Sequence, residues 1–204
     1  GETVNRNRSK AQRIRRAREA MLPIATQALT TPALGQAVRW YGDKCGDITY
    51  RMMKVSGMNE WQCCVILAAL SANTAWDVNV KRAIQAAEYI GGRDVRFPGG
   101  TKYHVDNILW AGNNAKYDTA RMLTGRKTRN FARAIYGDES AVTVDLWMCK
   151  AANLTKRDGD PVKRPTDAQY DIVEAAIDQV SQIIGLSPRD TQALIWIHVR
   201  GSAD

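Results

Sequence analysis

Histidine is scarce in this chain of 204 residues, which contains only His104 and His198. Neither histidine has a cysteine or a carboxylate beside it at the spacing of a metal-binding motif, so we expect no metal site and no metal-dependent catalysis. Long apolar runs are also missing, because no stretch approaches the roughly eighteen apolar residues that a membrane-spanning helix needs. The sequence therefore predicts a protein without a bound metal and without a membrane partner.

Several motifs that would define common enzyme classes are absent as well. The chain has neither a glycine-rich phosphate-binding loop nor a serine nucleophile elbow, which argues against nucleotide hydrolysis and acyl transfer. Its four cysteines match neither a zinc motif nor a disulfide framework, so we expect reduced thiols in the core. They are Cys45, Cys63, Cys64 and Cys149. The basic residues 6–18 are not followed by the apolar core of a signal peptide, and we expect the protein to stay inside the cell.

Acidic residues are outnumbered, with 21 Asp and Glu against 29 Lys and Arg, and the net charge is +8. Such an excess favours an anionic partner, of which nucleic acid is the commonest. Much of it lies near the N-terminus, at Arg6, Arg8, Lys10, Arg13, Arg15, Arg16 and Arg18. Two interpretations remain open for this segment: contact with DNA phosphates, for which Arg13 and Arg16 are our candidates, or a solvated helix.

Apolar residues recur at helical spacing along almost the whole chain, and no convincing alternation of period two appears. We therefore expect an all-α fold in a single unit. Its parts would be a basic N-terminal helix (1–28), a first helical part (29–100), a segment with the candidate catalytic residues (101–150) and C-terminal helices (151–204). The individual helices are expected at 8–28, 31–55 (one or two), 58–72, 76–90, 103–123 (short), 127–136 and 146–154. A polar, basic loop at 156–165 separates these from two more helices, one that Gly185 ends and one that Ser187 begins. A glycine- and proline-rich break at 91–100 is the best candidate for a boundary.

Local signals predict where several of these helices begin and end. Gly137 should end the helix that starts at Lys127, and Asp145 stands where an N-cap belongs, after a short extended link at 141–144. Gly185 should end one helix and Ser187 should begin the next. The helix before Gly185 carries an apolar stripe that we assign to the core: Ile172, Val173, Ala176, Ile177, Val180, Ile183 and Ile184.

The segment that best suggests chemistry is GRKTRNFARAIYGDESAVTVDLWMCKAANL at residues 125–154. It resembles the helix-hairpin-helix DNA glycosylases of the endonuclease III superfamily, in which GRKT is followed eighteen residues later by a VD that opens a helix. LSANTAWDVNVKRA (70–83) and ALIWIHVRG (193–201) resemble two further family segments, in the same order. Within this superfamily the chain more closely resembles small phage and actinobacterial proteins in which a GxK segment and a VTVD-W segment recur.

The resemblance implies a two-lobed helical fold with a cleft between the lobes, and a DNA glycosylase that excises a damaged or modified base. It implies Lys127 as the nucleophile, with possible abasic-site lyase activity, and Asp145 as the acid beside it. The implied partner is double-stranded DNA, with no cofactor and a monomeric protein. The remaining candidates are DNA contacts at Asn73, Gly125, Arg126, Thr128 and Arg200, and a base pocket lined by Trp76, Trp147 and Trp196.

The chain also departs from the family. The hairpin before the lysine, LPGVG in the family, is shortened to Leu123, Thr124 and Gly125, and the four-cysteine loop of an iron–sulfur cluster is missing, so no cluster is expected. Two alternatives therefore stay open: a base-modifying transferase on the same fold, and a DNA-binding protein without catalysis. In the simplest interpretation Lys127 is a phosphate-contacting or solvated lysine at a helix end and Asp145 is only an N-cap. Asn73 then only terminates a helix, and each tryptophan is part of the core.

Overall fold

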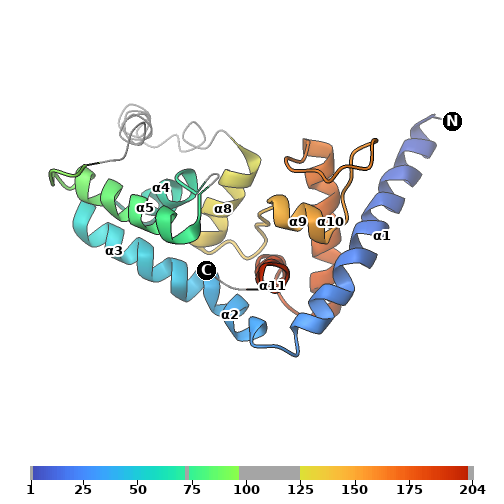
Figure 1. The fold of residues 1–204 in the computed structure, drawn as a ribbon, viewed down its shortest axis with the longest axis horizontal. Coiled ribbons are helices and arrows are strands. Elements are labelled where there is room, and N and C mark those ends of the chain that lie inside the picture. The colour runs from blue at the N-terminus through green and yellow to red at the C-terminus, as the bar shows by residue number, and fades with distance from the viewer. Residues whose placement is uncertain (1, 72–73, 97–124, 202–204) are drawn as a thin grey trace. The chain divides into compact units, whose positions relative to one another are not determined.

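The computed structural model describes residues 2–71, 74–96 and 125–201, and all regular elements there are helices (Figure 1). The all-α fold expected from the sequence is confirmed. The helices of 103–123 expected from the sequence, and Asn73, lie outside the described residues. The described chain divides into two compact units: the first joins segments from both ends of the chain, Gly1–Trp40 and Glu139–Ala203, and the second comprises Tyr41–Asp138. The single unit and the cleft expected from the sequence stay predictions.

The first unit is built from helices at both ends of the chain. These are α1 (Glu2–Ala28), α2 (Ala33–Arg39), α9 (Leu146–Ala151), α10 (Asp167–Ile184) and α11 (Pro188–Arg200). Helix α1 packs along α10 and α11 through a buried stripe at Ala17, Met21 and Ala25, which recur every fourth residue on one helix face. Figure 1 shows α1 and α10 side by side. The short helix α9 packs against α11, which places the start of α9 beside the last turns of α11.

The apolar stripe of α10 forms the centre of this core. Ile172, Val173, Ala176, Ile177 and Val180 are buried, as the sequence predicts. Ile183, which we also assigned to the core, is 59% exposed, so that prediction is wrong. It lies three residues beyond Val180, about 60° away around the helix axis in the last turn, where the core no longer covers the helix.

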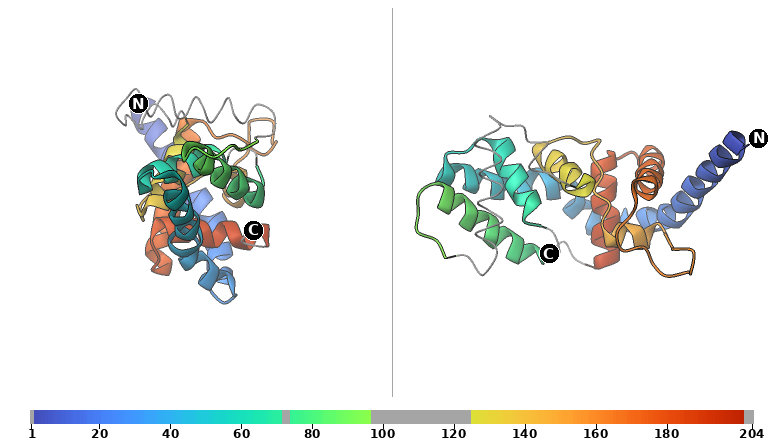
Figure 2. Two further views of the ribbon diagram at one scale, coloured as in Figure 1. Left: turned by 90° about the vertical axis from the view of Figure 1, so that its left-hand side faces the viewer. Right: turned by 90° about the horizontal axis from the view of Figure 1, so that it is seen from above.

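The second unit contains α3 (Gly46–Ser56), α4 (Glu60–Ala69), α5 (Trp76–Ile90) and α8 (Arg126–Tyr136), preceded by a π-helix at Trp40–Cys45. Helix α4 is central and contacts α3, α5 and α8, which Figure 2 shows around it in cyan, green and yellow. Its residues from Cys63 to Ala68 are all buried. A reciprocal capping box between Asn59 and Gln62 begins α4, with each side-chain oxygen accepting a backbone N–H of the other residue at 2.9 and 3.0 Å.

Glycine is required where α3 and α5 meet. A Cβ atom on Gly91 would lie 2.0 Å from the backbone oxygen of Val55, a distance that no side chain tolerates.

All four cysteines are buried free thiols, as predicted. No helix among the described residues is long and apolar enough to cross a membrane.

Candidate functional site

Asp145 begins α9 as the sequence predicts, and both oxygens of its carboxylate accept hydrogen bonds. Oδ1 accepts a hydrogen bond from the backbone N–H of Met148 at 2.9 Å, which is the N-cap interaction. Oδ2 accepts a second hydrogen bond from the indole N–H of Trp196 in α11, at 2.8 Å. The side chain is half-buried, so the carboxylate is both oriented and partly open to solvent.

The extended link before Asp145 is clamped by Tyr170 of α10. The Tyr170 hydroxyl donates to the carbonyl of Val142 and accepts from the N–H of Val144, the latter at 3.2 Å. Val142, Val144 and Tyr170 are all buried, so one hydroxyl satisfies two backbone groups that water does not reach. The backbone directly before Asp145 is thereby fixed to α10.

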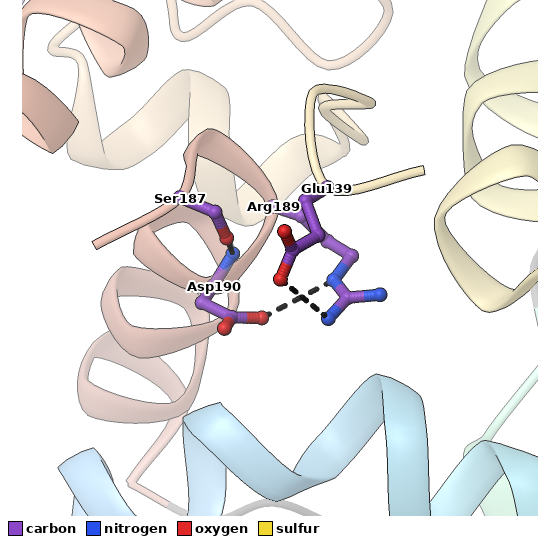
Figure 3. Close-up of polar contacts among 4 residues, drawn as sticks. All are labelled: Glu139, Ser187, Arg189 and Asp190. Carbon is purple, nitrogen blue, oxygen red and sulfur yellow. Dashed lines mark hydrogen bonds and ion pairs between the residues drawn. The ribbon is translucent and has the colours of Figure 1, made fainter. Parts of the chain in front are cut away.

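The start of the same link is fixed to α11 by Arg189, as Figure 3 shows. The backbone N–H of Arg189 donates to the Glu139 carbonyl at 2.9 Å, and its guanidinium lies 3.8 Å from the Glu139 carboxylate. The guanidinium also bonds Asp190 at 3.2 Å, while the Asp190 N–H donates to the N-cap hydroxyl of Ser187 at 3.1 Å. The Arg189 side chain is only 10% exposed, and its ion pairs are therefore less screened than those of surface residues. Both ends of the link to Asp145 are thus anchored within the first unit.

The indole that holds Asp145 is itself held from two sides. Trp40 contacts the Trp196 ring edge to face, with centroids 5.5 Å apart. The Arg200 guanidinium lies over the Trp196 ring at 4.2 Å, a cation–π contact. Arg200, a predicted DNA contact, thus lies near Asp145 through the tryptophan between them.

Lys127 lies in the first turn of α8 in the second unit, half-buried like its neighbours Arg126 and Thr128. The N-cap is Gly125, with φ −110° and ψ 144°, and no side chain caps the helix. This conformation is open to any residue, and a Cβ atom on Gly125 would meet only the Thr128 hydroxyl, at an ordinary 3.8 Å. The fold of the described residues therefore does not require glycine at position 125.

The second unit also contains Trp76, at the start of α5, where its ring contacts Phe131 of α8 edge to face at 6.4 Å. This contact supports a packing role for Trp76. In the first unit, Trp147 of α9 is half-buried with the Lys150 ammonium over its ring at 4.7 Å. Arg13 and Arg16 are exposed on α1.

Sequence reasoning missed the side chains that hold Asp145 and the link before it. Tyr170 lies 26 residues from Val144 in the sequence, and Trp196 lies 51 residues from Asp145. No rule of sequence spacing links positions so far apart. Trp196 was noticed only as a base-pocket candidate, and Tyr170 not at all. Within the described residues, no group of three His, Cys, Asp or Glu side chains gathers where it would hold a metal ion.

The chain belongs to the family of unknown function DUF7178, whose model matches residues 5–203. Neither a curated protein nor a solved structure matches it.

Proposed function

We propose that this protein is a DNA N-glycosylase that removes a damaged or modified base through Lys127 and Asp145. The observation that carries the proposal is the half-buried Asp145 carboxylate, fixed by Met148 and Trp196 at the head of α9. A carboxylate whose position is fixed by hydrogen bonds to both oxygens is suited to stabilise positive charge on a sugar. The spacing to Lys127 and the three segments that resemble the endonuclease III superfamily support it. We further propose that the protein acts as a monomer inside the cell, on double-stranded DNA.

In the proposed reaction the target base is flipped out of the duplex, at a cost of about a few kcal/mol. The neutral amine of Lys127 attacks C1′ of the sugar while the C1′–N bond to the base breaks. The base leaves with the bonding electron pair and takes up a proton, and the new ammonium group on the sugar loses one. The C1′–O4′ bond of the sugar ring then breaks, O4′ takes up a proton, and the nitrogen lone pair forms the protonated Schiff base with C1′. Asp145 stabilises the positive charge that develops on the sugar.

Borohydride trapping tests this proposal. The protein is incubated with duplexes that carry an abasic site or one of a set of modified bases, reduced with borohydride, and examined for a covalent protein–DNA adduct. We expect an adduct with the wild-type protein and none with Lys127→Ala. Lys81→Ala is the matched control, because Lys81 is an exposed lysine of α5 in the same unit. Base release without any adduct would instead indicate water as the nucleophile, and neither adduct nor base release on any duplex would refute the proposal.

A DNA-binding protein without catalysis is the second candidate, favoured by the exposed cations of the first unit. Arg13 and Arg16 lie three residues apart on α1, on one side of the helix. A second set of exposed cations flanks a compact turn in which Lys156 N–H bonds the Asp160 carbonyl at 2.8 Å. This set is Lys156, Arg157, Lys163 and Arg164.

The salt dependence of binding tests these cations. Each phosphate contact that is lost should reduce the slope of log K against log salt by about 0.9 on duplex DNA. We expect Arg13→Gln with Arg16→Gln to reduce the slope, and the control Arg15→Gln to change it less. Arg15 is already engaged with Glu19, its Nε lying 3.7 Å from the carboxylate. Salt-sensitive binding with no adduct and no base release would favour this candidate over the glycosylase.

A further inference from the structure

The second hydrogen bond to Asp145 exceeds what a helix cap needs. In the same unit, the N-caps of α10 and α11 each offer one hydroxyl: Thr166 accepts from the Gln169 N–H at 3.2 Å, and Ser187 from the Asp190 N–H at 3.1 Å. Asp145 satisfies its helix in the same way with Oδ1 alone. The bond from Trp196 to Oδ2 is therefore not explained by capping.

The hydrogen bond from Trp196 fixes the plane of the Asp145 carboxylate. Rotation about the bond to a carboxylate group is broad, with no sharply staggered minima, so one hydrogen bond leaves its plane loosely defined. Two bonds on different oxygens, from α9 and from α11, define that plane. The donor ring is itself held by Trp40 at its side and by Arg200 over its face.

We propose that Trp196 is the positioning residue of the site: its indole N–H orients the Asp145 carboxylate for the reaction, and the contacts of Trp40 and Arg200 hold the indole in place. This inference rests on the proposed glycosylase function. Trp196 acts through Asp145, not on the DNA. Its loss should therefore slow the chemical step and leave DNA affinity unchanged, since small misplacements of a reacting group are costly to rate.

The experiment removes the N–H and keeps the ring. Benzothienylalanine, in which sulfur replaces the indole N–H, is incorporated at position 196 by suppression of a stop codon. The single-turnover rate of base release is measured with protein in excess, together with the Kd for the same duplex and the thermal midpoint. A hydrogen bond to a charged group is worth roughly tenfold to a hundredfold in an equilibrium or a rate, and we expect a loss of that size in rate alone.

Trp61 provides the matched control. It is a half-buried tryptophan of α4 that packs edge to face against Tyr136, with ring centroids 5.2 Å apart, and it belongs to none of the candidate sites. The same replacement at position 61 should leave rate, Kd and thermal midpoint at their wild-type values.

Three results overturn the inference, and they differ from one another. A wild-type rate with benzothienylalanine at position 196 refutes the positioning role and leaves the proposed function standing. A slower rate accompanied by weaker DNA binding or a lower thermal midpoint assigns Trp196 to the fold. If the wild-type protein neither releases a base nor forms an adduct on any duplex, the proposed function fails and the role of Trp196 with it.

Discussion

Replacing Tyr170 by phenylalanine removes a single oxygen atom and should destabilise the first unit strongly. The hydroxyl serves two backbone groups of the link to Asp145, the carbonyl of Val142 and the N–H of Val144. Tyr170 is 3% exposed and the two valines 1% and 0%, so water does not reach the backbone groups that lose the hydroxyl. A buried polar group that loses its hydrogen bond costs about 1–3 kcal/mol. From the Val144 N–H, which loses the oxygen that accepts it, we expect a loss of about 1–3 kcal/mol in the free energy of unfolding.

Urea unfolding followed by far-ultraviolet circular dichroism measures this loss. The midpoint should fall while the dependence on denaturant stays unchanged, because the surface exposed on unfolding is the same. Tyr50→Phe is the control: Tyr50 is 58% exposed, and its loss of a hydroxyl should change stability by less than about 0.5 kcal/mol. A change below about 0.5 kcal/mol for Tyr170→Phe would show that the clamp on the link contributes nothing, and the argument would be wrong.

Two further predictions concern the cap and the thiols. Asp145→Ala should lower the free energy of unfolding by about 1–2 kcal/mol. Asp145→Asn should lower it by less, because asparagine can still cap α9. If thermal unfolding shows the same loss of stability for both variants, the cap does not have the role assigned to it. Burial raises the pKa of the Cys63 thiol to about 11 and that of Cys64 to about 12, with the charge of Glu60 adding to both shifts. Since thiols of the unfolded chain ionise near pH 8.5, these two contribute stability that is complete below about pH 8.5 and is lost as pH rises toward 11–12. Ellman's reagent at pH 8 should accordingly label neither thiol in the native protein and both in guanidinium, and fast native labelling would refute their burial.

Local patterns in the sequence predicted most of the helices and their ends. The N-cap at Asp145 and the start of α11 at Ser187 both follow from short-range hydrogen bonding, which a few neighbouring residues determine. One end was wrong. Helix α9 was expected to continue to residue 154 but ends at Ala151, because the chain turns there and Asn153 takes a left-handed conformation with φ 52°. The exposed Ile183 has a similar cause. The apolar period of a helix predicts which side of it faces the core, but not how far along that side the neighbouring helices bury it.

By itself, then, the sequence determined the helical class, the buried thiols and the cap that presents Asp145, because each depends on residues within a turn or two of one another. Only the tertiary structure decided what that carboxylate contacts. Tyr170 and Trp196 reach the link and the carboxylate because α9 packs against α11 and the link against α10. Such contacts come from the packing of helices distant in sequence, and no local pattern along the chain specifies them.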